Sequence, residues 1–168
     1  ESIEQTFNGQ ADFGRRVQCV ISRNGDLAYR TYLQVTLPEI NQLMGVASFA
    51  AGTGSGVYAR WLDFPGEQLI AQVEVEIGGQ RIDKHYSQWL YIWNELSLPV
   101  GKQPAWKKMV GYEGSGQAVT GQTGVVNLFV PLEFWFNRNV GLALPLIALQ
   151  YHEVKINIDF ETLTNCLQ

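Results

Sequence analysis

Hydrophobic and polar residues alternate along several stretches of the chain, and this alternation predicts β-strands with one buried face. The clearest case is residues 68–77, where every second residue from Leu69 is apolar. Most of the positions between are polar, with Glu74 and Glu76 among them. We expect one face of this strand to lie in the core and the other to be solvated.

Two dipeptides predict tight turns between such strands. Asn24-Gly25 lies between residues 15–22 and residues 27–37, which both alternate, so we expect them to form an antiparallel hairpin. Gly78-Gly79 follows residues 68–77 and leads into a short strand over residues 80–83.

Three further stretches have strand patterns, namely residues 58–64, 125–136 and 146–160. Residues 102–124 are polar and rich in glycine, so we expect a long irregular loop there. Since strands do not alternate with helices, a parallel sheet is excluded. Strands joined by long connections favour an antiparallel β-sandwich with Greek-key wiring, as in a jelly roll.

One helix is predicted inside this β protein, over residues 85–97. Its N-cap would be Asp83, and Pro99 would stop it. Apolar side chains recur at spacings of three and four residues along one expected buried stripe: Tyr86, Trp89, Leu90, Trp93 and Leu96.

Size and charge narrow the class of protein. A chain of 168 residues is the size of one domain, so we expect residues 1–168 to form a single domain. Charged residues make up 17% of the chain and its net charge is −4. The chain therefore lacks the excess of basic residues that is typical of a nucleic-acid-binding protein. No stretch reaches the roughly 18 apolar residues that a membrane span needs. We expect Cys19 and Cys166 to be free thiols, although the sequence leaves a disulfide open.

Candidate chemistry is sparse. Glu74 and Glu76 lie on the same face of one strand, at a spacing that roughly matches the two carboxylates of a retaining glycosidase, but a solvated polar face explains them more simply. Neither His85 nor His152 has a partner at a metal-ligand spacing. The glycine-rich residues 52–56 lack the lysine of a phosphate-binding loop. We therefore expect no catalytic residue, no metal and no cofactor.

Several aromatic residues lie outside the predicted core pattern. Trp61 and Trp106 adjoin loops, Tyr112 lies in the glycine-rich stretch, and Trp135 stands between two phenylalanines. We expect these four residues to contact another subunit or domain. An alternative is a lectin-like jelly roll that binds carbohydrate, with Trp106 stacking on a sugar.

Three separated segments resemble one protein family. Residues 75–96 (VEIGGQRIDKHYSQWLYIWNEL) resemble the strand, turn, strand and helix of the major capsid proteins of nucleocytoplasmic large DNA viruses, including iridoviruses, phycodnaviruses and marseilleviruses. Residues 131–154 (PLEFWFNRNVGLALPLIALQYHEV) resemble a second hallmark of that family, and residues 24–35 resemble its first hairpin. The segments occur in the family's order over nearly the whole chain.

The resemblance implies a fold and a role. Family members carry two consecutive jelly rolls, so this chain corresponds to the first: an all-β, antiparallel jelly-roll β-sandwich with one short inserted helix at about residues 85–97. Three polypeptides form a trimer of pseudo-hexagonal outline, and trimers tile an icosahedral shell above an internal membrane.

The resemblance also implies a place and partners. It implies a protein of the virion capsid shell that is assembled in the host cytoplasm. Its partners would be copies of itself in a homotrimer, neighbouring capsomers, the second jelly roll and minor capsid proteins. It implies no direct contact with nucleic acid, and only an indirect relation to the membrane.

Overall fold

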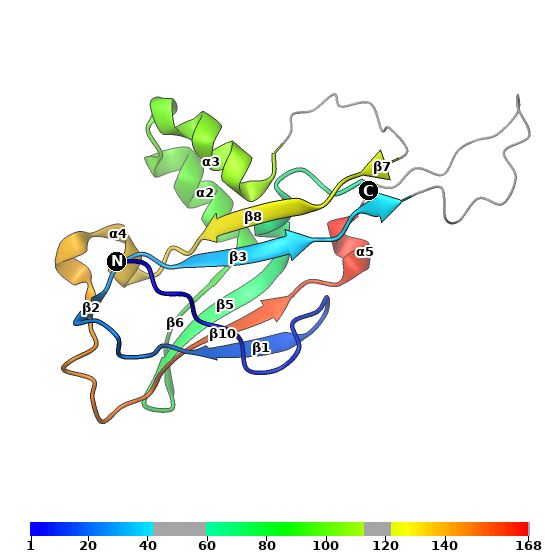
Figure 1. The fold of residues 1–168 in the computed structure, drawn as a ribbon. Helices are drawn as coiled ribbons and strands as arrows, with labels where there is room; N and C mark the ends of the chain where they lie inside the picture. Colours follow the sequence, from blue (N-terminus) through cyan, green and yellow to red (C-terminus); the bar gives the residue numbers. More distant parts are fainter. Residues whose placement is uncertain (42–59, 113–121, 168) are drawn as a thin grey trace, which may run out of the picture.

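The computed structural model describes residues 1–41, 60–112 and 122–167, and antiparallel strands form most of its regular structure (Figure 1). The strands are β1 (Arg16–Val20), β2 (Leu27–Ala28), β3 (Tyr32–Leu37), β4 (Ile40–Asn41), β5 (Ile70–Ile77), β6 (Gln80–Tyr86), β7 (Gln122–Thr123), β8 (Val126–Pro131), β9 (Leu144–Pro145) and β10 (Val154–Phe160). The helices are α1 (Pro65–Gln68), α2 (Ser87–Ser97), α3 (Gln103–Val110), α4 (Trp135–Arg138) and α5 (Leu163–Cys166), with 3₁₀ turns η2 (Val100–Lys102) and η3 (Val140–Leu142).

The main sheet has the strand order β1-β10-β5-β6, and each neighbouring pair is antiparallel. The register aligns Val17 with Ile158, Ile158 with Val73, and Val73 with His85. Residues directly opposite each other share a face of the sheet. All four are buried, so this row faces the core.

A second layer, the β3–β8 pair, lies over this sheet (Figure 1). Its buried residues Leu33, Leu37, Leu128 and Val130 belong to the same core cluster as the inner residues of the main sheet. The short pairs β2–β9 and β4–β7 form separate two-stranded sheets, whose strands are not hydrogen-bonded to the strands of these two layers. The predicted all-β sandwich with one apolar face on each layer is confirmed.

The N-terminal segment packs along the sandwich. Asn8 forms a bridge with Gln18 of β1, and the amide nitrogen of Asn8 donates to the carbonyl oxygen of Gln18 at 2.7 Å. The ring of Phe7 meets Phe160 edge-on, with 6.3 Å between centroids. These contacts tie the first residues of the chain to both β1 and β10.

The predicted hairpin between residues 15–22 and 27–37 is wrong. Strand β1 pairs with β10, while the second stretch divides into β2, which pairs with β9, and β3, which pairs with β8. Asn24-Gly25 therefore turns the chain from one layer to the other. Both stretches bury one face, but long-range packing, which a turn dipeptide does not encode, selects their partners.

The second predicted hairpin is confirmed. Gly78 and Gly79 have positive φ angles of 58° and 83°, which glycine adopts without steric cost, and they join β5 to β6. Strand β6 runs on to Tyr86, so Asp83 lies within a strand and the predicted N-cap is wrong. The inserted helix α2 is confirmed, beginning at Ser87 and ending at Ser97, shortly before Pro99.

Four predicted stretches differ from the structure. Residues 60–64 form no strand beyond an isolated bridge of Trp61 with Leu167, and residues 58–59 lie outside the described part. Residues 103–110 form α3, contrary to the predicted irregular loop, because Trp106 and Val110 bury one face of a helical turn. Within the predicted strand 125–136, β8 ends at Pro131 and helix α4 follows. Within the predicted strand 146–160, residues 146–153 are mostly turns and only β10 is a strand. Within the described ranges, no helix is long and apolar enough to cross a membrane.

Candidate functional site

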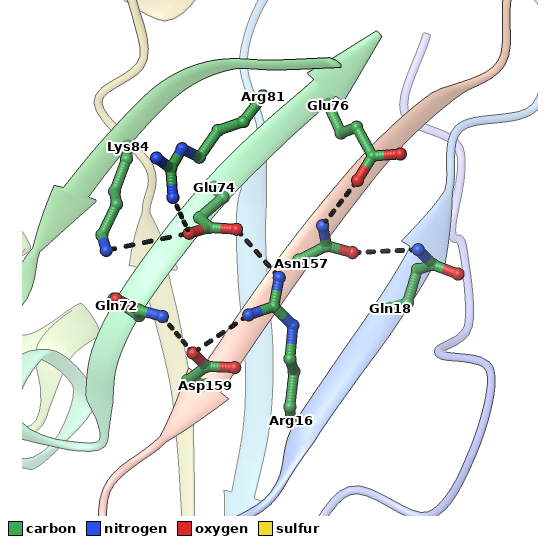
Figure 2. A network of polar contacts seen from close by, with 9 residues as sticks. All are labelled: Arg16, Gln18, Gln72, Glu74, Glu76, Arg81, Lys84, Asn157 and Asp159. Carbon is green, nitrogen blue, oxygen red and sulfur yellow. Dashed lines mark hydrogen bonds and ion pairs between the residues drawn. The ribbon is translucent and has the colours of Figure 1, made fainter. Parts of the chain in front are cut away.

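The outer face of the main sheet carries a polar network made of two neighbouring groups of contacts (Figure 2). The register that turns Val73 inward places Gln18, Asn157, Glu74 and Lys84 in one outward row across all four strands. The side-chain amide of Gln18 donates to Asn157 Oδ1 at 3.1 Å, and Asn157 Nδ2 donates to Glu76 Oε2 at 3.4 Å. Side chains therefore link β1, β10 and β5 in addition to their backbone ladders.

Glu74 is the centre of the second group of contacts in this network. Its Oε2 accepts from Arg16 Nη2 at 2.8 Å, and its Oε1 lies 3.3 Å from Arg81 Nη1 and 3.8 Å from Lys84 Nζ. The residue is only 5% exposed, because these long cationic side chains cover it. The alternation predicted its face correctly, but the prediction that the carboxylate is solvated is wrong.

The cations decide the charge state of Glu74. Burial on its own would raise the pKa of this carboxyl, but hydrogen bonds from Arg16 and Arg81 and their positive charge outweigh burial and hold the pKa below its usual value. Arg16 also lies 3.5 Å from Asp159 Oδ2, which accepts a hydrogen bond from Gln72. The network thus joins β1, β10, β5 and β6 through ion pairs.

This geometry does not favour glycoside hydrolysis. An acid catalyst must hold a proton near neutral pH, whereas Glu74 is kept ionised by three cations. Glu76 accepts from Asn157. His85 lies on the opposite face of the sheet, in the row of Val73. The network stabilises strands and offers no acid–base pair.

Histidines and cysteines are placed in the core or in turns. His85 is buried with its ring against Phe134 at 4.6 Å between centroids. Burial, followed by the charge of Arg138, lowers the pKa of His85 to about 4. Cys19 and Cys166 are free and buried, as predicted. Among the described residues, no three His, Cys, Asp or Glu side chains are grouped to hold a metal ion; residues 52–56 lie outside that part.

The four predicted contact residues differ in their surroundings. Trp61 is 9% exposed and stacks on Phe13, and Trp106 is 5% exposed beside Phe64. Their burial in the chain's own core leaves little surface for a partner. Tyr112 is half-buried and stacked on another ring, and Trp135 is half-buried beside the core. Trp106 and Tyr112 both pack against the ring of Phe64, whereas Trp61 and Trp135 pack elsewhere. As contact residues, all four stay predictions.

The solvent face of α2 carries exposed apolar residues, one of which, Leu96, the sequence pattern assigned to the core. Tyr91, Ile92 and Leu96 are 41%, 48% and 80% exposed, whereas Leu90 and Asn94 are buried. The predicted stripe is therefore wrong for Leu96, and also for Tyr86, which is 49% exposed at the end of β6. Large apolar residues surround most of this helix, so helical spacing alone cannot select the buried side. Ile92 and Leu96 lie four residues apart, so their exposed side chains are neighbours on one face of the helix.

A hollow of about 330 Å³ lies between the end of β1 and the start of β10. It is lined by Val20, Ile21, Ser22, Arg23, Leu146, Leu149, Glu153 and Val154. No aromatic ring lines this hollow, so it lacks the stacking platform that the carbohydrate-binding alternative requires. Trp106, the residue named for that role, is buried.

Comparisons with known proteins agree over the whole chain. The family model described as "Major capsid protein N-terminus" matches residues 1–168. A major capsid protein of Phaeocystis pouchetii virus is 57% identical, covering 99% of this chain and 35% of the relative. That of Chrysochromulina ericina virus is 53% identical, with the same two coverages, 99% and 35%.

The fold is also found in a solved capsid. In the quasi-atomic model of the PBCV-1 virus capsid, a chain that is 36% identical superposes with a TM-score of 0.74. The match covers 96% of this chain and 34% of that one. This similarity confirms the predicted antiparallel jelly-roll class. The chain spans about a third of the length of the relatives it matches.

Proposed function

Because this chain belongs to the viral major capsid protein family, we propose that it is a structural unit of the capsid shell of a large DNA virus. The observation that carries the proposal is the family match along all 168 residues, with 57% identity to a major capsid protein. The polar network supports a structural role, since it ties four strands and supplies no acid–base pair. We propose no enzymatic activity.

The proposal extends to domain organisation and partners. Residues 1–168 form one jelly roll, the first of two in the full polypeptide. Three polypeptides associate into a pseudo-hexagonal capsomer whose neighbours are further capsomers and minor capsid proteins. The exposed apolar residues of α2 supply surface for such contacts, because burying apolar area drives association. The protein is located in the virion after assembly in the host cytoplasm.

Two measurements test the proposal. Purified full-length polypeptide is expected to sediment as a trimer and to show pseudo-hexagonal particles by electron microscopy. A strictly monomeric species at high protein concentration would contradict the assembly role. Residues 1–168 alone are expected to unfold in one cooperative transition with the β-rich circular dichroism of a sandwich; a non-cooperative chain would contradict the single-domain assignment.

A further inference from the structure

A buried carboxyl group lies where three helices meet the sandwich. Glu67 of α1 is 2% exposed. Its Oε1 accepts a hydrogen bond from Asn94 Nδ2 of α2 at 3.4 Å. Its Oε2 is buried and has no hydrogen-bond partner in the described part of the chain. A carboxyl in this environment is poorly stabilised as an anion, since only one neutral amide replaces its water.

Helix α1, which carries Glu67, is closely packed against its neighbours. An added Cβ on Gly66 would lie 2.7 Å from Val130 Cγ2 and 3.2 Å from the carbonyl oxygen of Val110. Helix α1 is therefore held closely between α3 and β8. Asn94 is itself buried, 5% exposed, and also donates to the carbonyl oxygen of Leu90 at 2.8 Å. Glu67 and Asn94 thus form a fixed buried contact between α1 and α2.

We propose that the Glu67–Asn94 contact is a proton-dependent switch, in which the neutral carboxyl of Glu67 stabilises the packing of α1 against α2 and its ionised form weakens it. Burial raises the pKa of Glu67 to about 8, the hydrogen bond from Asn94 opposes this, and the charge of Glu95 adds to it. The inference rests on these contacts and is independent of the proposed capsid role.

The charged groups on the elements around α1 do not neutralise Glu67. Helix α2 contributes Glu95, which has the same sign. On α3, Lys107 lies over the ring of Tyr112, 5.1 Å from its centroid, and Lys108 is exposed. Strand β8 has no ionisable side chain, and α5 contributes only the buried thiol of Cys166. On β5, Glu74 is bound by cations of the outer network and Glu76 by Asn157.

The sign of the pH effect follows from linkage. A carboxyl whose folded pKa lies above its unfolded value of 4.5 keeps its proton in the folded chain after the unfolded chain has lost it. The stabilisation is complete below that unfolded value. It declines as pH rises towards about 8, and above that no further change comes from this group.

The test compares the pH dependence of unfolding for three chains. Wild type, Glu67→Gln and Glu4→Gln are unfolded in urea between about pH 5.5 and pH 7.5. Relative to Glu67→Gln, the folding equilibrium constant of the wild type is expected to fall up to about tenfold for each pH unit. Glu4→Gln, which removes an exposed carboxylate from the N-terminal segment, is the matched control and keeps the wild-type slope. Identical slopes for wild type and Glu67→Gln would overturn the proposal.

A second measurement covers the case in which Glu67→Gln does not fold. Infrared spectra are recorded on chain labelled with ¹³C-glutamate in a Glu133→Gln background, because burial also raises the pKa of Glu133. A protonated glutamic acid band is expected at neutral pH and should disappear in alkaline buffer while the fold persists. Absence of that band at neutral pH would overturn the proposal.

Discussion

Asn137 holds α4 against the connection between β2 and β3, and its removal is expected to cost a large part of the stability. The side chain is 7% exposed. Its Nδ2 donates to the carbonyl oxygen of Tyr29 and, at 3.1 Å, to Thr31 Oγ1, while its Oδ1 accepts from the amide nitrogen of Phe134 at 3.0 Å. One amide therefore satisfies backbone groups from two segments more than a hundred residues apart in sequence.

The cost of Asn137→Ala can be worked out from these contacts. The buried amide hydrogen of Phe134 loses its acceptor, which costs about 1–3 kcal/mol. The carbonyl of Tyr29 is partly buried and loses a bond of about 0.5–1.5 kcal/mol net. We expect a total loss of about 2–4 kcal/mol, which is substantial beside the roughly 5–15 kcal/mol of a typical domain.

Urea unfolding followed by tryptophan fluorescence measures this loss, since Trp135 lies two residues away in α4. The matched control is Asn139→Ala. Asn139 is exposed and its Oδ1 accepts only from the amide nitrogen of Gly141, at 2.9 Å, so about 0.5–1 kcal/mol is expected. Equal losses for the two variants would refute the reasoning, because burial and the second segment would then contribute nothing.

Three further predictions concern the core and the network. His85→Leu is expected to make the free energy of unfolding less sensitive to acid. In the wild type, this free energy should fall by about 1.4 kcal/mol per pH unit as pH falls from 6.5 towards 4, because the unfolded chain binds the proton first. Thermal melts of both chains across this window would show the difference in slope. Gly66→Ala should lower the free energy of unfolding by about 1–3 kcal/mol, because its Cβ would clash with Val130. Gly101→Ala, whose Cβ meets nothing within 4 Å, should leave it unchanged, so similar melting temperatures for the two variants would contradict this reasoning. Glu74→Ala should lower the free energy of unfolding by about 1–3 kcal/mol, because it leaves three cations close together. Added salt should restore part of this stability in urea titrations, and a loss independent of salt would argue against the electrostatic cause.

Local signals in the sequence predicted local structure well. The Gly78-Gly79 turn required two positive φ angles, and only its immediate neighbours had to pair. The alternation of residues 68–77 likewise gave a strand in which Val73 and Val75 of the inner row are buried, although Ala71 and Ile77 are only half-buried. Pairing between distant strands was beyond such signals, so Asn24-Gly25 was assigned to a hairpin although β1 pairs with β10.

For the polar network, the sequence predicted the face of the strand but not the burial of the side chains, because burial also depends on contacts between distant strands. Period-two alternation placed Glu74 on the outer face, but its burial depends on Arg16 from a strand 58 residues away in sequence. The buried side of α2 was also misassigned, because Leu96 and Leu90 are equally apolar and only the fold distinguishes them. Glu67 lies two residues after Pro65, between the predicted strands 58–64 and 68–77, and gave no sequence signal of burial at all.

The two border strands of the main sheet, β1 and β6, bear on how copies of the chain can meet. An open strand border is a template for β-pairing with another molecule, and therefore for fibrous aggregation. The backbone of Asn8 already occupies part of the β1 border. On β6, the register irregularity opposite Val75 and Glu76 and the exposed charge of Arg81 disturb the regular ladder that an added strand would need. Backbone pairing of a second chain onto either border is thus disfavoured, which reduces the tendency of a concentrated solution of this domain to form continuous sheets.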